Sequence, residues 1–353
     1  MKSLIEQWNG EAVVARYDEP TGSWMFIAIH DTTLGPAMGG CRMKVYSTPE
    51  EGLRDAMRLA EGMTYKWAAI GFDLGGGKSV LAVPQVPEGD QRRGLLRRFG
   101  KLVDMFRGAY ACGPDLGTTP ADMTAIGEET DHVHGVDRET GEAIDPGPYT
   151  ALGVFSGMRA ALREVFGEAT FEGRTVLVQG VGDVGVPLAR MLDEAGASLL
   201  LSDVERGRAK VLAEELRADV VEAEDVYGVV CDVYAPCAVG ATLSVETIPR
   251  LACRIVAGSA NNQLAEPADA DRLHERGILY APDYVINAGG ATALPLLGQR
   301  TKTAEEIRER LRGFEQVLEE IFREAATREE SPYHAAQRRV ERVLKERGAG
   351  TVG

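Results

Sequence analysis

The second half of the chain alternates short apolar runs with helical patterns, and this alternation restricts the fold more than any other feature. Apolar runs at Thr175–Gln179 and Ser198–Ser202 flank a helical segment at Val184–Ala195. Further runs follow at Val229–Tyr234, Arg254–Ala257 and Ile278–Tyr280. Apolar strands separated by helices are typical of a parallel sheet that is covered on both faces. The sequence therefore predicts a doubly wound α/β domain in this half.

The loop after the first apolar run carries the glycine spacing GxGxxG. It directly follows a strand pattern and opens a helix, and Asp203 stands at the end of the second apolar run. This context predicts a Rossmann-type dinucleotide site. The first glycine allows a tight turn, the second lets the backbone approach a pyrophosphate, and the third lets helix and strand pack closely. The residues expected to bind the dinucleotide are Gly180, Gly182, Asp183, Val184, Gly185 and Asp203.

Asp203 also bears on which dinucleotide is bound. Its carboxylate would accept hydrogen bonds from an adenosine ribose and would repel a 2′-phosphate, which favours NAD over NADP. Arg206 and Arg208 lie close in sequence and would soften that repulsion. We therefore predict NAD as the cofactor and leave the strictness of this preference open.

The first half of the chain contains two lysines framed by glycine. Lys66 and Lys78 bracket a mainly apolar stretch, and the glycines Gly75–Gly77 precede Lys78. Most lysines are solvated surface cations, but these glycines would let a ligand or another backbone segment approach Lys78 closely. Two cations in a site that excludes water push one toward the neutral amine, which is a base, while the other can hold a carboxylate.

The remaining patterns suggest an α/β arrangement in the first half and helices near the C-terminus. Two β-rich stretches precede a glycine-rich loop, and threonine–proline signals start helices at Thr48 and Thr119. A capped, long last helix with an apolar stripe begins at Thr303. The expected segments are strands Glu11–Tyr17 and Trp24–His30, the loop Gly35–Arg42, a helix from Thr48 to about Gly62, and helices Gly94–Arg107 and Ala151–Phe166.

Turn-forming residues at Asp145–Pro148 mark a hinge between two domains. We expect residues 1–146 to form an α/β substrate-binding and oligomerisation domain, to which residues 326–353 return. Residues 147–325 are expected to form the Rossmann-like NAD-binding domain, with the active site in the cleft between the two.

Composition excludes several classes of partner. The chain has 39 basic and 54 acidic residues, which argues against nucleic acid or an anionic membrane surface as the main partner. No apolar run approaches the roughly 20 residues of a membrane span, and the start lacks the apolar core of a signal peptide. The five cysteines form no CxxC pair and the five histidines no metal-binding spacing. We expect a cytoplasmic protein without a metal centre.

Several segments, in one order, resemble the amino-acid dehydrogenase family that includes glutamate, leucine, phenylalanine and valine dehydrogenases. The compact length and the lysine spacing are closer to the leucine and phenylalanine branch. The resemblance implies oxidative deamination of an L-amino acid to a 2-oxo acid and ammonia, with hydride transfer to a nicotinamide, in a homo-oligomer. The segments are GPAMGGCRM from Gly35, GMTYK from Gly62, GGGKSV from Gly75, GPDLGT from Gly113, GVGDVG from Gly180, GSANNQL from Gly258 and APDYVINAGG from Ala281.

The resemblance also implies roles for individual residues in the first half. Lys66 is expected to hold the substrate α-carboxylate, assisted by the backbone at Gly39 and Gly40. Lys78 is expected to be the general base that activates a water attacking an imine intermediate. Asp115 is expected to exchange protons with the amine, although an aspartate after proline is also a common turn former.

Further roles carried over by motif concern the nicotinamide. Thr150, Asn261 and Asn262 are expected near its carboxamide, and Asn287 at its substrate side. For the three asparagines, turn or backbone hydrogen bonding is the alternative interpretation.

The substrate side chain is expected to be apolar. Glutamate-specific members carry a lysine where this chain has Met38, and a distal carboxylate without that cation would be buried unpaired. Met38 as simple core filler is the alternative. The expected pocket walls are Met38, Gly113, Ala291 and Leu294. We expect a leucine- or valine-like substrate, and phenylalanine or another aromatic amino acid as the alternative, because Gly113 and Ala291 are small.

Two other functions fit the sequence less well. A 2-hydroxy-acid dehydrogenase usually needs a histidine as acid and base, and here no histidine lies in a glycine-framed loop. A non-catalytic NAD-binding module would have no use for a base, so the presence of Lys66, Lys78 and Asp115 argues against it.

Overall fold

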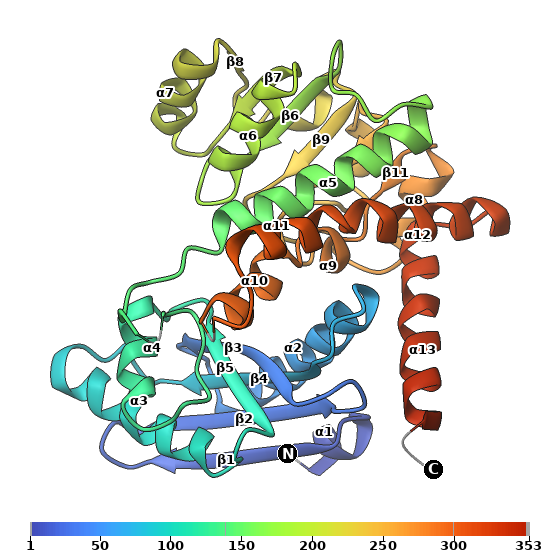
Figure 1. Cartoon of the computed structure of the whole chain (residues 1–353). Coiled ribbons are helices and arrows are strands. Elements are labelled where there is room, and N and C mark those ends of the chain that lie inside the picture. The colour runs from blue at the N-terminus through green and yellow to red at the C-terminus, as the bar shows by residue number, and fades with distance from the viewer. Residues whose placement is uncertain (1, 138, 299, 351–353) are drawn as a thin grey trace. The chain divides into compact units, whose positions relative to one another are not determined.

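The computed structural model describes residues 2–137, 139–298 and 300–350, and they form two compact units (Figure 1). As far as it is described, the first unit contains Met1–Asp145, Leu294–Lys302 and Val340–Gly353. The second contains Pro146–Ala293 and Thr303–Arg339. None of the described helices is both long enough and apolar enough to cross a bilayer.

The unit boundaries differ in part from those expected from the sequence. The first lies after Asp145, one residue before the expected position. The chain then re-enters the first unit at Leu294–Lys302, which no sequence signal indicated, and again at Val340 instead of residue 326. Both points of re-entry, Leu294 and Val340, fall inside helices, which explains why turn-forming residues do not mark them.

The first unit is built on a five-stranded mixed sheet with the order β1-β2-β4-β3-β5. β1 and β2 are antiparallel, as are β2 and β4, whereas β3 runs parallel to both β4 and β5. The strands are β1 (Ala12–Asp18), β2 (Ser23–Asp31), β3 (Ala37–Lys44), β4 (Gly75–Ala82) and β5 (Tyr110–Pro114). The helices are α1 (Lys2–Gln7), α2 (Pro49–Ala69), α3 (Gly89–Asp104) and α4 (Pro120–Gly127).

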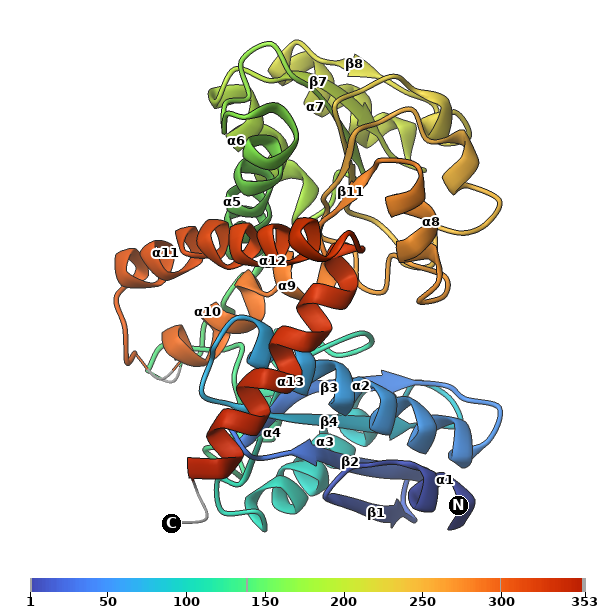
Figure 2. The same cartoon turned by 90° about the vertical axis from the view of Figure 1, so that its right-hand side faces the viewer.

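Strand alternation divides this sheet into two apolar faces. Figure 2 shows the strands of this sheet and the helices of the same unit. Phe26, Ala28, Val80 and Ala82 point to the face covered by α2. Their neighbours in sequence pack with residues of α3, α4 and β5 on the other face. Because side chains alternate along a strand, Lys78 lies on the α2 face with Val80.

The glycine-rich segment expected to be a loop is the strand β3, and Gly75–Ala82 is a strand as well. Glycine weakens a strand and lowers its sequence signal. Here it is required by close packing. A Cβ on Gly39 would lie 1.7 Å from the carbonyl oxygen of Gly77, and one on Gly76 would lie 1.9 Å from Oγ1 of Thr64 in α2.

Helix α2 continues to Ala69, beyond the expected end near Gly62. Gly62 is exposed and costs about 1 kcal/mol of helix propensity, which burial of Thr64, Trp67 and Ala68 in the following turns offsets. Thr48 caps the helix as predicted by accepting a hydrogen bond from the Glu51 backbone N–H (3.3 Å). The carboxylate of Glu51 accepts from the backbone N–H of Ser47 instead of Thr48, so the two residues do not form a full capping box.

The second unit contains a six-stranded, wholly parallel sheet with the order β11-β10-β9-β6-β7-β8. This is the strand order of doubly wound dinucleotide-binding folds, and it confirms the predicted fold class. β6 (Thr175–Gln179) and β7 (Ser198–Ser202) have the predicted bounds. The other strands are β8 (Asp219–Val220), β9 (Val233–Pro236), β10 (Ile255–Val256) and β11 (Leu279–Tyr280).

Long helices complete the second unit. α5 (Gly147–Phe166) and α12 (Phe314–Arg328) lie side by side (Figure 1). The predicted apolar stripe from Ile307 to Ile321 is buried, but the helix that carries it is interrupted at Gly313. The remaining helices are α6 (Gly185–Glu194), α7 (Arg206–Leu216), α8 (Asp269–Glu275), α9 (Asp283–Ile286), α10 (Gly289–Gly298), α11 (Ala304–Arg312) and α13 (Pro332–Gly350), with short 3₁₀ turns at Val226–Gly228 and Ile248–Arg250.

Candidate active site

Lys78 and Asp115 form a buried ion pair in the first unit. Lys78 lies in the middle of β4 and is 5% exposed, and Asp115 directly follows β5. The Lys78 amine donates to Oδ2 of Asp115. Gly40 of β3 completes the cluster, because a Cβ there would lie 2.9 Å from Oδ2 and 3.0 Å from the lysine nitrogen. The structure thus brings three predicted site residues together.

The other oxygen of Asp115 has its own donors. Oδ1 accepts from Nε of Arg42 (2.8 Å) and from the backbone N–H of Leu116 (2.7 Å). Burial alone would raise the pKa of this carboxyl group, but Lys78 and Arg42 more than offset that effect and hold its pKa below the ordinary value. Asp115 is therefore a fixed, ionised carboxylate.

Arg42 is a functional candidate that the sequence analysis missed. Its NH1 group donates to Oδ2 of Asp55 in α2 (2.9 Å), and the Tyr46 hydroxyl donates to the same oxygen (2.7 Å). Arg58 donates to the other oxygen of Asp55 (2.8 Å). The only sequence signal was the position of Arg42 two residues after the paired glycines. Its partners lie 13 and 73 residues away.

Lys66 lies in the last turn of α2. The next residue, Trp67, donates its indole N–H to the carbonyl oxygen of Met38 in β3 (3.3 Å). The end of α2 therefore packs against the strand that carries Gly39 and Gly40, on the face that also holds Lys78. Lys78 itself contacts the carboxylate of Asp115, a counter-ion that the sequence analysis did not pair with it.

The glycines before Lys78 serve packing within the protein. Gly76 lets α2 approach β4, and Gly77 faces the ring of Tyr110, which would lie 2.8 Å from a Cβ at that position. Another part of the chain thus approaches closely, one of the two options that the sequence left open.

Two predicted pocket residues of the first unit lie close together. A Cβ on Gly113 would lie 3.8 Å from the carbonyl oxygen of His134 and 4.0 Å from Cδ1 of Leu294, both ordinary van der Waals distances. A methyl group would therefore fit at Gly113 without a clash. His134, which is 3% exposed, was not singled out from the sequence. Met38 is 4% exposed in β3. Ala291 is half-buried and belongs to the second unit.

The glycine loop of the second unit has the geometry that a dinucleotide site needs. Gly180 has a φ of +98°, which favours glycine. A Cβ on Gly185 would lie 1.9 Å from the Gly180 carbonyl oxygen, whereas a Cβ on Gly182 would meet no atom within 4 Å. Gly182 and Asp183 are exposed at the start of α6. The tight turn thus occurs at Gly180, the close packing at Gly185 and the accessible backbone at Gly182, which are the positions expected from the sequence.

Asp203 follows β7 and stabilises this loop. Its carboxylate accepts from the backbone N–H groups of Val181 (2.9 Å) and Glu205 (2.8 Å). The two neighbouring arginines are engaged elsewhere: Arg206 pairs with Glu222 (2.5 Å) and Arg208 with Glu205 (3.0 Å).

The residues predicted near the nicotinamide form two local clusters in the second unit. Asn287, 5% exposed, donates to Oδ1 of Asn261 (2.8 Å) and to the Ser259 carbonyl (3.1 Å). Asn262 is exposed and has a φ of +51°. Thr150 accepts from the Gly290 backbone N–H (3.1 Å). The side chains of Asn287, Asn261 and Thr150 thus form hydrogen bonds within the second unit.

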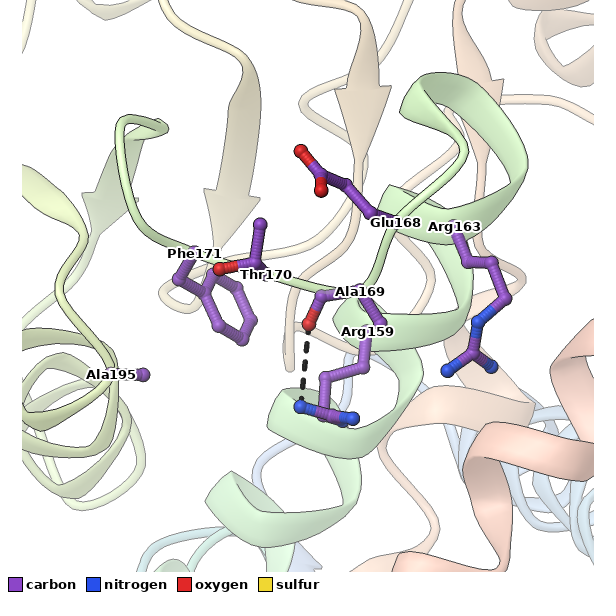
Figure 3. A pocket seen from close by; sticks show the side chains of 7 residues that line it. All are labelled: Arg159, Arg163, Glu168, Ala169, Thr170, Phe171 and Ala195. Carbon is purple, nitrogen blue, oxygen red and sulfur yellow. Dashed lines mark hydrogen bonds between the residues drawn. The ribbon is translucent and has the colours of Figure 1, made fainter.

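A surface hollow beside α5 involves none of the predicted site residues (Figure 3). Its two arginines are occupied within the protein. Arg159 donates to Glu315 (2.9 Å) and to the Ala169 carbonyl (3.3 Å), and Arg163 pairs with Glu315 (3.0 Å). The hollow is lined by Arg159, Arg163, Glu168, Ala169, Thr170, Phe171 and Ala195.

Comparison with known proteins places the chain in a family. Residues 20–132 match the model of the Glu/Leu/Phe/Val dehydrogenase dimerisation domain, and residues 200–348 match that of glutamate/leucine/phenylalanine/valine dehydrogenase. The chain is 44% identical to leucine dehydrogenase from Geobacillus stearothermophilus, covering 97% of this chain and 92% of the relative. It is 39% identical to phenylalanine dehydrogenase from Lysinibacillus sphaericus, covering 96% of this chain and 89% of that relative.

A solved structure supports the same assignment. L-tryptophan dehydrogenase from Nostoc punctiforme superposes with a TM-score of 0.86 at 36% identity, covering 98% of this chain and 99% of that one. The predicted resemblance is confirmed: the chain belongs to the glutamate, leucine, phenylalanine and valine dehydrogenase family, in its leucine and phenylalanine branch, and is a dinucleotide-dependent oxidoreductase.

Proposed function

We propose that the protein catalyses the reversible, NAD-dependent oxidative deamination of an apolar L-amino acid to its 2-oxo acid and ammonia. The observation that carries this proposal is the buried pair of Lys78 and Asp115, which packs on Gly40 in a chain of this family. A buried amine and carboxylate in contact can move protons between a substrate amine and a water molecule.

Each residue of the first unit has a defined task in this proposal. The Lys66 ammonium holds the substrate α-carboxylate, together with backbone groups at Gly39 and Gly40. Asp115 accepts a hydrogen bond from the substrate amine and exchanges its proton. As the substrate ammonium competes for Asp115, the attraction of the carboxylate for Lys78 weakens. Lys78 then releases its proton and serves as the base for the water that attacks the imine.

NAD fits the second unit, and it would supply the hydride acceptor when bound. The open position beside Gly182 and the start of α6 suit a pyrophosphate. Asp203 suits an adenosine ribose, while Arg206 and Arg208 pair with glutamates and leave its charge in place. Asp183 and Val184 complete the loop, and Thr150, Asn261, Asn262 and Asn287 are proposed for the nicotinamide end.

The Asp203→Asn variant tests this coenzyme preference. The asparagine keeps one oxygen, which can accept from the Val181 N–H, and removes the charge that repels a 2′-phosphate together with the acceptor for the Glu205 N–H. We expect the ratio of kcat/KM for NADP to that for NAD to rise about tenfold or more, or about 1.4 kcal/mol. Steady-state rates with both coenzymes measure it, with an unchanged melting temperature as the control. An unchanged ratio would contradict the proposed role of Asp203.

The substrate side chain is proposed to lie against Met38, Gly113, Ala291 and Leu294. Leucine- and valine-like substrates are supported by the leucine dehydrogenase relatives. A second candidate is a phenylalanine-like or other aromatic substrate, which the phenylalanine and tryptophan dehydrogenase relatives support and the small side of the expected pocket at Gly113 allows.

The Gly113→Ala variant separates these candidates. The added methyl group fits at ordinary van der Waals distances and narrows the space beside His134 and Leu294. We expect kcat/KM for phenylalanine to fall about tenfold or more relative to that for valine, because one methylene in a pocket changes binding by about 1–3 kcal/mol. Gly228→Ala, at an exposed glycine with no atom near its Cβ position, is the matched control. Equal effects on both substrates would contradict the proposal that Gly113 lines the substrate pocket.

The reaction itself is tested by NADH absorbance on mixing the protein with NAD and a panel of L-amino acids, with their D-enantiomers as controls. We expect signal with apolar L-amino acids and little with glutamate. NAD binding without turnover of any amino acid would support a non-catalytic module instead.

We also propose a cytoplasmic homo-oligomer. The matched dimerisation-domain model covers most of the first unit, and the cysteines Cys41, Cys112, Cys231, Cys237 and Cys253 are unpaired thiols. Light scattering on the purified protein measures the assembly, and a monomer at working concentration would contradict it.

A further inference from the structure

We propose that Arg42 is a positioning residue that shares the charge of Asp115 with Lys78 and so controls how readily Lys78 gives up its proton. This inference rests on the proposed function, in which Lys78 acts as the base. Arg42 acts through its contact with Asp115, and Asp55 in turn binds the Arg42 guanidinium.

The contacts divide the Asp115 carboxylate between two cations. Oδ2 accepts from Lys78, and Oδ1 accepts from Nε of Arg42 at 2.8 Å. The Leu116 N–H binds Oδ1 as well. The Arg42 side chain is only 19% exposed, so its charge is weakly screened by solvent. Each oxygen thus has a separate counter-ion, and the negative charge acting on Lys78 depends on Arg42.

Asp55 competes with Asp115 for the same guanidinium. Arg42 donates through NH1 to Asp55 at 2.9 Å while Nε remains on Asp115. Tyr46 and Arg58 each donate to Asp55, which keeps it fixed and ionised, and its pKa lies below the ordinary value although burial alone would raise it. The charge of Asp55 therefore reduces the positive potential that Arg42 exerts on Asp115.

Other titratable groups around the cluster leave this balance unchanged. Burial raises the pKa of the Cys41 thiol to about 12 and raises that of the Tyr110 hydroxyl well above its ordinary value, so both stay neutral. Asp122 of α4 is paired with Arg92 at 2.6 Å. Lys66, at the end of α2, is the other cation proposed for this face of the sheet.

The two partners of Arg42 predict shifts of opposite sign. Without the Arg42 charge, Asp115 attracts the Lys78 proton more strongly, so deprotonation requires a higher pH. Without the Asp55 charge, Arg42 neutralises Asp115 more fully, and deprotonation requires a lower pH. A purely structural role for this cluster would lower activity in both variants without moving the two profiles in opposite directions.

The experiment compares Arg42→Met, Arg42→Lys and Asp55→Asn with the wild-type protein. Arg98→Met is the matched control. Arg98 forms a bidentate ion pair with buried Asp18 in the same unit and does not contact Asp115. One readout is kcat for deamination as a function of pH, at saturating NAD and amino acid. The second is the rate of reductive methylation of Lys78 against pH, followed by mass spectrometry of its peptide, which requires no turnover.

We expect the midpoint of both profiles to rise by about half a pH unit or more in Arg42→Met and to return most of the way in Arg42→Lys. Asp55→Asn should lower it, and Arg98→Met should leave it in place. Unmoved midpoints in Arg42→Met, or shifts of the same sign in Arg42→Met and Asp55→Asn, would overturn the proposal. Should Arg42→Met fail to fold, the downward shift expected for Asp55→Asn, against an unmoved midpoint in Arg98→Met, decides it.

The methylation profile also separates this inference from the proposed function. If the protein deaminates no amino acid, the proposed function fails, and the labelling shifts still show whether Arg42 governs the Lys78 proton. If turnover is present and the labelling midpoints do not move, only the inference about Arg42 fails.

Discussion

Replacing Lys78 with alanine is expected to lower kcat for deamination about 10³-fold, a typical contribution of a positioned general base. The variant should still bind NAD, because the glycine loop and Asp203 belong to the second unit. Lys66→Ala should instead raise KM for the amino acid about 10²-fold, since a hydrogen bond to a charged group contributes about 1.5–3 kcal/mol. Steady-state kinetics with both variants measure this division of roles.

Lys78→Arg is the control for charge. Arginine keeps a cation opposite Asp115, but it stays protonated and cannot act as a base near neutral pH. We expect it to be as inactive as Lys78→Ala. An active Lys78→Arg variant, or an identical pure binding defect in the Lys66 and Lys78 variants, would contradict the assignment.

Replacing Asp115 with asparagine is expected to destabilise the fold by about 3 kcal/mol at neutral pH, because it leaves Lys78 buried without its counter-ion. It should also abolish most activity. Denaturant unfolding of the wild-type protein, Asp115→Asn, Lys78→Met and the double variant measures the coupling between the two side chains. We expect the double variant to be more stable than Asp115→Asn alone. Fully additive losses would indicate that the pair contributes no coupling.

The contribution of Asp115 should depend on pH with a defined sign. Its pKa is lowered in the folded protein, so its stabilisation is complete above the pKa of an unfolded aspartate, about 3.9. It is lost as the pH falls through the lower, folded value. The stability difference between the wild-type protein and Asp115→Asn should therefore be constant at neutral pH and shrink below about pH 4.

The second unit was largely predictable because its signals are local. The strand pattern of β6 and β7 and the spacing from Gly180 to Gly185 are carried by adjacent residues, and Asp203 follows at the expected interval. The structure shows β6 and β7 with the predicted bounds, whereas β9 (Val233–Pro236) begins four residues after the start of the expected Val229–Tyr234 strand. Signals of this kind depend on short-range periodicity, which a sequence displays directly.

The first unit was less predictable because glycines weaken the sequence signal of two of its strands. β3 and β4 contain glycines at Gly39, Gly40 and Gly75–Gly77, which lower strand propensity. The need for them is set by tertiary contacts, such as the approach of Thr64 to Gly76. No local pattern encodes such an approach.

The sequence also did not show which side chains contact the site residues. Lys78 and Asp115 could be named from motifs, but their contact joins positions 37 residues apart. The link from Asp115 to Arg42 spans 73 residues. The sequence places no carboxylate beside Lys78, whereas the folded chain pairs it with Asp115.

The central claim is that the Lys78 amine moves a proton during catalysis. The most direct measurement is kcat of Lys78→Ala in the presence of small primary amines, compared with tetramethylammonium, a cation that carries no exchangeable proton. We predict that methylamine restores activity in a saturable manner, increasingly as the pH rises and the free base forms, and that tetramethylammonium does not. Equal rescue by both cations, or wild-type activity without either, would contradict the account.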